Sequence, residues 1–236
     1  MNVFRSAGLL SFAILVFYAG CESNSLGPTT GTEASLQTQV EATELLGQGK
    51  AAEAISVLDQ AIHSSSNDAQ LLVVRGTVLR KTGEYDRAIM DFDGALALNP
   101  SLVDAYCQRA FSLQQKGQPG WQKAAMCDAN AAIKLDRKNA LAYVIRGNAW
   151  AADDEFRKAI VDFSNAIRWN PGSYSAYGNR ARAYASIGNH DQARQDMDYA
   201  LSLDMPADER ALFEELSDYL DTLFSAVPDR RQTSAY

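Results

Sequence analysis

Residues 69–102 read AQLLVVRGTVLRKTGEYDRAIMDFDGALALNPSL, and this stretch decides the fold because its pattern recurs along most of the chain. Gly83 marks a turn between two helical segments, and Pro100 ends the second of them. Small or aromatic residues at helical spacing line one face of the second segment, at Ala88, Phe92 and Ala95. The stretch therefore predicts a helical hairpin.

The hairpin recurs at a nearly constant period. The positions equivalent to Pro100 are Arg137, Pro171 and Met205, which gives spacings of 37, 34 and 34 residues. Five units follow, at 35–68, 69–102, 103–139, 140–173 and 174–207. Positions 20 and 27 of every unit are alanine, and position 8 is Ala42, Gly76, Ala110, Gly147 and Ala181 in turn. Small residues are needed where two helices cross most closely, because larger ones would push the backbones apart.

This order of residues resembles the tetratricopeptide repeat, a 34-residue helical hairpin. The resemblance implies an all-α fold, a right-handed superhelical solenoid of about five hairpins, because a single hairpin cannot bury its apolar face alone. The array spans residues 35–207. We expect residues 208–226, which are apolar at helical spacing, to form a C-terminal capping helix, and residues 227–236 to be disordered.

Composition limits the classes of function. The 236 residues are 47% hydrophobic and 22% charged, which is typical of a globular protein. A net charge of -7 disfavours nucleic acid as a partner, because binding to a phosphate backbone needs a basic face. Three cysteines and two scattered histidines predict neither a disulfide framework nor a metal site, and we expect no cofactor.

An apolar run precedes the array. Residues 7–18 read AGLLSFAILVFY after the single cation Arg5, which is typical of a secretory signal and shorter than the ~20 residues of a membrane-spanning helix. The small residues before Cys21 resemble the lipobox of bacterial lipoproteins, whose cysteine receives the lipid, although Tyr18 stands where an aliphatic residue is usual. An ordinary cleaved signal and a retained anchor are the alternatives.

The lipoprotein resemblance gives a domain order and a location. Residues 1–20 would be the signal peptide, and residues 21–34 the lipidated cysteine, carrying palmitate among its chains, with a flexible tether. The resemblance implies an exported protein of the cell envelope. Glu22, where an aspartate would favour the inner membrane, directs the expectation to the outer membrane, facing the periplasm.

Two positions carry opposite charges in the same four units. Position 7 is Arg75, Arg109, Arg146 and Arg180, and position 23 is Asp91, Asp128, Asp162 and Asp196. These positions lie on facing helices of a hairpin, so we expect an Arg-Asp pair that fixes the register of each hairpin. The competing interpretation is a ladder of cations for an anionic ligand.

The family resemblance also places a partner-binding groove on the first helices, at positions 2, 5, 6, 9, 12 and 13. The predicted groove residues are Val73, Val74, Thr77, Arg80, Lys81, Cys107, Gln108, Phe111, Val144, Ile145, Asn148, Asn179 and Arg182. The same mapping includes Gln114, Ala151 and Ala152. The lysine, asparagine and arginine clamp that some family members use for a chaperone's C-terminal carboxylate is absent.

Three further features have two interpretations each. We expect Cys107 and Cys127 to be free thiols rather than a disulfide, because they fall on different sides of one unit. Trp121 is expected to replace a missing packing aromatic, the alternative being an exposed binding residue. Asp154 occupies the usual glycine place of a turn, where a solvated turn that caps the next helix is favoured over a bound divalent cation.

No arrangement of Ser/His/Asp, Cys/His or paired carboxylates recurs with a catalytic context, so we expect no enzyme. The sequence instead indicates a scaffold or adaptor that binds other proteins or peptides through its concave groove. The alternative is an envelope protein that binds a small ligand or glycan in the same groove. Neither the partner nor the oligomeric state is indicated.

Overall fold

The computed structural model describes residues 30–65 and 67–225, which form eleven α-helices and no strand. The helices are α2 (Thr30–Gly47), α3 (Ala51–Ser64), α4 (Ala69–Lys81), α5 (Tyr85–Leu98), α6 (Val103–Lys116), α7 (Trp121–Leu135), α8 (Ala140–Ala152), α9 (Phe156–Trp169), α10 (Tyr174–Ser186), α11 (His190–Ser202) and α12 (Ala207–Ser225). The all-α solenoid of five hairpins and one further helix is confirmed.

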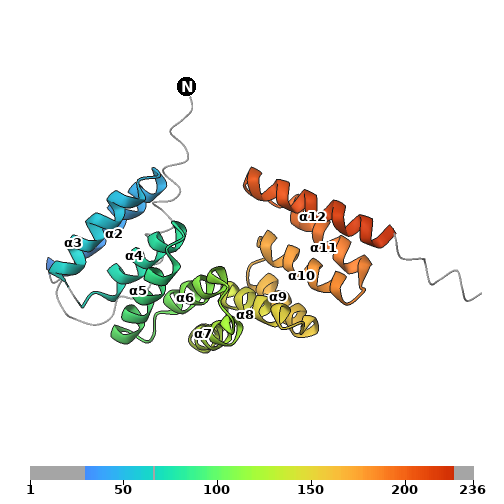
Figure 1. The fold of residues 1–236 in the computed structure, drawn as a ribbon, viewed down its shortest axis with the longest axis horizontal. Coiled ribbons are helices and arrows are strands. Elements are labelled where there is room, and N and C mark those ends of the chain that lie inside the picture. The colour runs from blue at the N-terminus through green and yellow to red at the C-terminus, as the bar shows by residue number, and fades with distance from the viewer. Residues whose placement is uncertain (1–29, 66, 226–236) are drawn as a thin grey trace, which may run out of the picture.

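Consecutive helices pack as antiparallel pairs, from α2 with α3 to α10 with α11, and each pair packs on the next. Figure 1 shows that the pairs follow a U-shaped path, with α6 to α9 at the base and α2 to α5 and α10 to α12 in the two arms. The first helices of successive hairpins also contact one another, from α4 through α6 and α8 to α10. They therefore form one continuous surface.

The small residues lie at the helix crossings, as predicted. Ala88, Ala125, Ala159 and Ala193, at position 20 of four units, are fully buried. The glycines at position 8 face aromatic rings, because a Cβ built on Gly147 would lie 2.6 Å from Phe163 Cε1, and one built on Gly76 would lie 2.8 Å from Phe92 Cε1. These two glycines make room for the two phenylalanines of the core.

The turn inside each hairpin needs a left-handed residue. Four units use glycine there, with φ of 77° at Gly49, 83° at Gly83, 65° at Gly117 and 79° at Gly188. The fourth unit has Asp154, with a φ of 59°. Aspartate adopts this conformation more readily than most residues, but glycine does so without steric cost. The prediction that Asp154 takes the place of the turn glycine in this unit is confirmed. The predicted capping of the next helix is wrong for the side chain, because Glu155, at the N-cap of α9, makes no side-chain capping bond.

This turn allows a first prediction. We expect Asp154→Gly to raise the free energy of unfolding by about 0.5–1 kcal/mol, because it removes the left-handed strain of a residue with a Cβ. Urea unfolding of the full chain, followed by circular dichroism, measures the change. Gly83→Asp is the matched reverse substitution and should destabilise by a similar amount. An Asp154→Gly variant that is less stable than the parent would contradict this account.

The N-terminal boundary differs from the expected one. Helix α2 begins at Thr30, so residues 30–34 continue the helix where a tether was predicted. Ser35 is buried, and its hydroxyl donates a hydrogen bond to the carboxylate of Asp68, which itself caps α4. This hydrogen bond connects the first helix of the first hairpin, α2, to the N-terminus of the first helix of the second hairpin, α4. The predicted signal at 1–20, the lipidated Cys21 and the tail at 227–236 lie outside the described residues.

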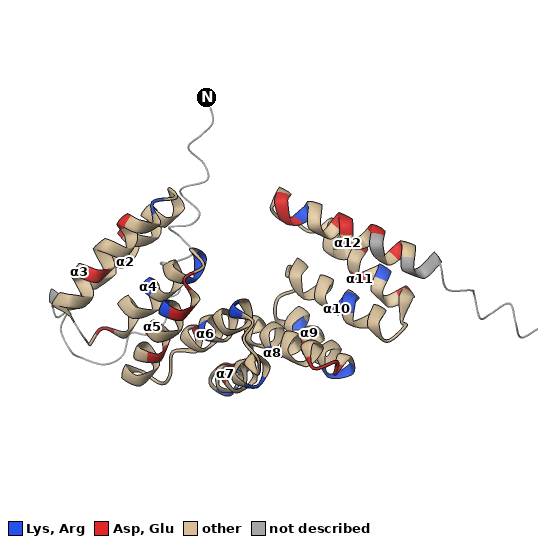
Figure 2. Ribbon diagram, viewed as in Figure 1, with Lys and Arg blue, Asp and Glu red and all other residues tan. Residues whose placement is uncertain are grey.

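Helix α12 covers the end of the array. Leu220 is buried, and Phe213 and Leu216 pack against the core formed with Ala181 and Met197. Leu212, in contrast, is 64% exposed and lies outside that contact. Figure 2 shows acidic residues along α12, consistent with a polar outer face. Among the helices of the described residues, none combines the length and apolar content that crossing a bilayer requires.

Candidate partner-binding groove

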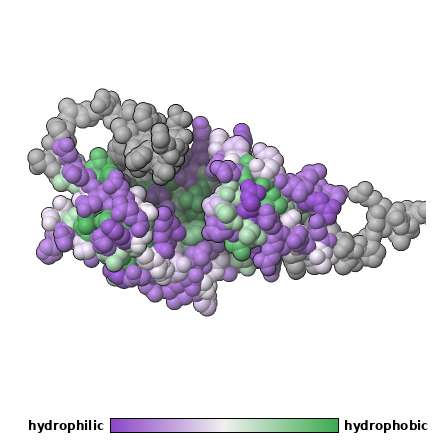
Figure 3. Space-filling model, turned by 90° about the horizontal axis from the view of Figure 1, so that it is seen from above, coloured by the Kyte–Doolittle hydropathy of each residue, from purple (hydrophilic) through white to green (hydrophobic). Residues whose placement is uncertain are grey.

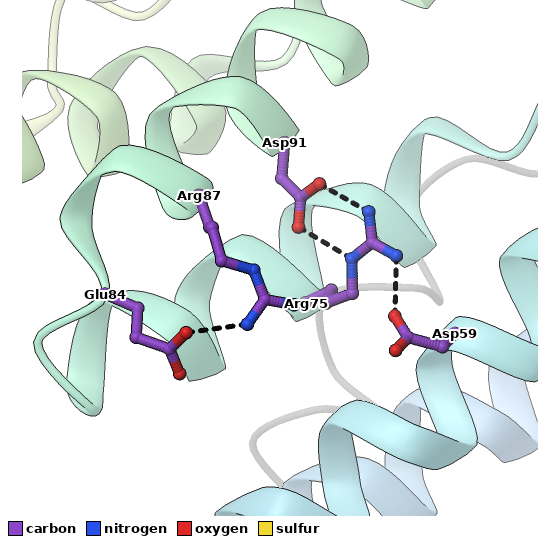
Figure 4. A network of polar contacts seen from close by, with 5 residues as sticks. All are labelled: Asp59, Arg75, Glu84, Arg87 and Asp91. Carbon is purple, nitrogen blue, oxygen red and sulfur yellow. Dashed lines mark hydrogen bonds and ion pairs between the residues drawn. The ribbon is translucent and has the colours of Figure 1, made fainter.

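An arginine joins the two helices of each of four hairpins. In the second unit, Arg75 donates from Nε and Nη2 to the two carboxylate oxygens of Asp91, at 2.8 and 2.6 Å. The same two-bond geometry recurs at Arg109 with Asp128, Arg146 with Asp162 and Arg180 with Asp196. The predicted register pair is confirmed, and Figure 4 shows the first example.

The third nitrogen of each arginine reaches back to the preceding hairpin, which the sequence pattern did not predict. Nη1 of Arg75 donates to Asp59, 2.7 Å away, as Figure 4 shows. The equivalent acceptors, always sixteen residues before the arginine, are Asp93, Asn130 and Ser164. Hydrogen bonding to carboxylates raises the pKa of all four arginines above its usual value. These cations are therefore structural and are already neutralised.

Three predicted groove residues belong to the core instead, which corrects the prediction. Val73, Cys107 and Ile145 are only 6%, 1% and 0% exposed. Each lies at position 5 or 6 of its unit, where the next hairpin covers the first helix; Val73, for example, packs in one cluster with Ala105 of α6. These side chains stabilise the stacking of repeats and cannot contact a partner.

Several other predicted groove residues already pack against, or form hydrogen bonds with, other residues of the protein. Val74 and Val144 are half-buried against core clusters, and the hydroxyl of Thr77 donates to the carbonyl of Val73. Gln108 donates from Nε2 to Asp104 at 3.2 Å. Lys81 and Arg182 are exposed, and neither forms an ion pair with another described residue.

A row of amide side chains runs across the first helices of three successive hairpins, α6, α8 and α10. Asn179 of α10 donates from Nδ2 to Oδ1 of Asn148 on α8, at 3.1 Å. Asn148 in turn donates from Nδ2 to Oε1 of Gln114 on α6, at 3.3 Å. We call Gln114, Asn148 and Asn179 the amide track. Each member keeps further donor or acceptor capacity, because a primary amide has two N–H groups and two lone pairs.

A cavity of about 380 Å³ lies along the amide track. Besides the track, it is lined by Trp121, Ala151, Ala152, Phe156, Phe163, Arg182, Ala183 and Ser186. Trp121 also packs against the core of the third unit, which confirms its predicted packing role while leaving one side toward the cavity. Figure 3 looks into the hollow of the U and shows hydrophobic residues inside it, with hydrophilic residues around the rim. The cavity thus combines apolar walls with amide groups.

At the α4 end of the same surface, Arg80 stacks on Phe111 of α6. The guanidinium carbon lies 4.9 Å from the ring centroid, within cation-π range. Phe111 is one helical turn before Gln114, so this stack adjoins the amide track. The predicted groove residues Arg80, Phe111, Asn148, Asn179 and Arg182 therefore lie on one surface that crosses α4, α6, α8 and α10.

The two cysteines of the described residues are free thiols, as predicted. Cys127 is exposed, whereas Cys107 is buried, and its Sγ lies 3.7 Å from Oδ1 of Asn139. Burial raises the pKa of Cys107 to about 12, so this thiol stays protonated and unreactive at neutral pH. No group of three or more His, Cys, Asp or Glu side chains in the described part of the chain is placed to hold a metal ion.

Comparison with known proteins agrees with the repeats. The family models for the tetratricopeptide repeat match residues 40–102 and 163–195. Tetratricopeptide repeat protein 6 of Homo sapiens is 29% identical over 149 residues, which cover 63% of this chain and 29% of that protein. The chain spans less than half the length of the curated relatives it matches.

Solved structures share the fold. A thermophilic TPR protein from Thermus thermophilus superposes with a TM-score of 0.65 at 16% identity, covering 78% of this chain and 97% of that one. YrrB, described as a TPR protein with an unusual peptide-binding site, gives a TM-score of 0.56 at 21% identity, covering 79% and 98%. On its sequence repeats and the family-model matches at residues 40–102 and 163–195, the chain belongs to the tetratricopeptide-repeat family.

Proposed function

We propose that this protein is a non-enzymatic scaffold that binds an extended segment of a partner protein across α6, α8 and α10. The amide track carries the proposal. Side-chain amides present donors and acceptors at once, which is what the N–H and C=O groups of an extended peptide require. TPR proteins commonly bind other proteins or peptides, so the family supports the same conclusion.

The walls beside the track supply the remaining affinity. Trp121 and Phe156 flank the cavity with aromatic surface, and Ala151 and Ala152 leave room for a partner side chain between them. Burial of one apolar side chain in such a space contributes roughly 1.5–3 kcal/mol. The track would therefore hold the main chain of a partner, and the cavity would select one of its side chains.

A small ligand or glycan is the second candidate, because a cavity of about 380 Å³ lined by amides and aromatic rings has the size and chemistry of a small-molecule site. The groove extends beyond the cavity to the stacked pair Arg80 and Phe111, however. A compact ligand would leave that part uncovered, whereas an extended segment would cover all of it. This continuity favours a protein partner.

We further propose that Cys21 carries a lipid that anchors the protein at the cell envelope, at the outer membrane and facing the periplasm. The small residues before Cys21 and the apolar run at 7–18 support this location. Labelled palmitate should enter the parent chain but not a Cys21→Ala variant. A Cys21→Ala variant that still labels and sediments with membranes would refute the anchor.

The scaffold function is tested by affinity purification of the full chain from its native host, with a double Asn148→Ala, Asn179→Ala variant in parallel. We expect a stoichiometric protein partner that the parent retains and the double variant loses. Met90→Ala, a substitution at a 71% exposed position on α5, is the matched control and should retain the partner. Recovery of a glycan without stoichiometric protein, or turnover of a substrate that depends on the track, would refute the proposal.

A further inference from the structure

Arg80 differs from the four structural arginines in having no ion-pair partner among the residues that the structure describes. It is half-buried, its Nε is shielded from solvent, and that nitrogen has no hydrogen-bond partner within the same residues. Buried charged groups in proteins are nearly always paired, because an unpaired charge loses its hydration without compensation. Arg80 therefore carries a positive charge that no ion pair within the described residues neutralises.

Neighbouring acidic groups do not fill this role. Asp104 of α6 is the carboxylate that acts on Arg80 electrostatically, yet it accepts a hydrogen bond from Gln108 and forms no ion pair with Arg80 in the described structure. Loss of hydration lowers the pKa of Arg80, whereas carboxylate bonding raises that of Arg75, Arg109, Arg146 and Arg180. The position of Arg80 in the last turn of α4 suits the helix dipole but leaves its Nε unsatisfied.

The stack on Phe111 orients the guanidinium for an external ligand. A guanidinium lying over a ring keeps its N–H groups in its own plane, so the two Nη groups, beyond the shielded Nε, form a fork that matches the two oxygens of a carboxylate. Lys81, the next residue on α4, is exposed and adds a second positive charge to this end of the helix. A single fork with one lysine suits a carboxylate side chain better than a polyanionic backbone, which needs a wider basic face.

A second cation lies at the other end of the amide track. Arg182 is one helical turn beyond Asn179, lines the cavity and forms no ion pair within the described residues. First helices in contact lie about 10 Å apart, so the three steps from α4 to α10 cover on the order of 30 Å. An extended chain rises about 3.3 Å per residue, and roughly nine residues would span that distance.

We infer that the groove recognises an acidic segment of a partner protein, with one Asp or Glu side chain bound by the Arg80 fork over Phe111 and a second bound by Arg182. The inference rests on the proposed function of the groove and adds the chemistry of the partner. The two acidic residues are separated by roughly nine positions of extended chain. The amide track holds the main chain between them.

Stability gives a test that needs no partner. Arg80→Met keeps a long apolar side chain on Phe111 and removes only the charge, so the thermal midpoint of the full chain should stay the same or rise. Arg146→Met is the matched control, and its midpoint should fall by several degrees, because Asp162 would lose its partner. If Arg80→Met destabilises the chain as much as Arg146→Met does, Arg80 has a structural partner and the inference is wrong.

Selection from a displayed library of random 12-residue peptides tests the partner chemistry. Peptides chosen by the parent chain should be enriched in Asp and Glu, and fluorescence anisotropy should show that Arg80→Met weakens a selected peptide at least tenfold. Exchange of one peptide Glu for Gln should weaken binding to the parent equally and leave binding to Arg80→Met unchanged.

Two results separate the inference from the proposed function. Peptides that bind the parent and lose affinity with Asn148→Ala, yet carry no acidic residue and ignore Arg80→Met, would overturn the inference alone. A library that yields no peptide dependent on Asn148 would overturn both. Binding of single-stranded DNA at the groove in place of peptides would likewise overturn the acidic-segment inference.

Discussion

Replacement of Asp162 by alanine is expected to lower the free energy of unfolding by about 2–4 kcal/mol. The carboxylate of Asp162 is 4% exposed and accepts two hydrogen bonds from Arg146, at 2.8 and 2.7 Å. Loss of one partner of a buried pair costs about 3–5 kcal/mol, since the other charge stays desolvated. Arg146 keeps 23% of its side-chain exposure, so water repays part of that cost.

Two controls show whether the unpaired charge causes the loss. The double variant Arg146→Met, Asp162→Leu removes both charges and should recover most of the stability, because apolar groups of similar size can replace a buried ion pair. Glu84→Ala breaks an exposed pair with Arg87 and should cost less than about 1 kcal/mol. Equilibrium denaturation of the three variants measures these differences. A double variant less stable than Asp162→Ala would contradict the explanation.

Gly147→Ala should also destabilise the chain, by about 1–2 kcal/mol, although alanine normally favours a helix. The added Cβ would lie 2.6 Å from Cε1 and 2.8 Å from Cδ1 of Phe163, whose side chain is almost fully buried. Overpacking of this kind costs about 1–3 kcal/mol. The gain in helix propensity, at most about 1 kcal/mol, offsets only part of it.

Another repeat of the chain suggests a second substitution that should restore stability to Gly147→Ala. The equivalent pair in the first unit is Ala42 with Leu58, both fully buried. Adding Phe163→Leu to Gly147→Ala should therefore restore part of the loss, and the double variant should be at least 1 kcal/mol more stable than the sum of the single changes predicts. Gly47→Ala is the control: its new Cβ would meet no atom within 4 Å, so stability should stay constant or rise. Additive effects of the two substitutions would refute direct contact.

The sequence alone was sufficient for the fold because every unit repeats the same small residues at the same places. Arg75 and Asp91 could be paired for the same reason, since their positions recur together in four units. The acceptors of the third arginine nitrogen were missed because Asp59, Asp93, Asn130 and Ser164 differ in residue type. Their constant spacing of sixteen residues before each arginine was the available signal.

The groove was harder to predict than the fold. Position numbers indicate which face of a first helix a residue occupies, but they do not indicate how far the next hairpin covers it. Position alone predicts that Val73, Cys107 and Ile145 line the groove, whereas the next hairpin makes them core residues. The sequence predicts that Arg80 lies on the groove. It does not predict that Arg80 has no ion-pair partner, because that depends on where Asp104 and Phe111 lie in space. The burial of the three core residues and the pairing of Arg80 both depend on contacts between neighbouring units, which position numbers do not describe.

The bonds from each arginine to the preceding hairpin change character along the chain. The acceptors are carboxylates at Asp59 and Asp93, then the amide of Asn130 and the hydroxyl of Ser164. The first two junctions are therefore ionic and half-exposed, each adding up to about 1 kcal/mol that salt screens, and the last two are neutral. Rising salt should therefore weaken the first two junctions between hairpins and leave the last two nearly unchanged.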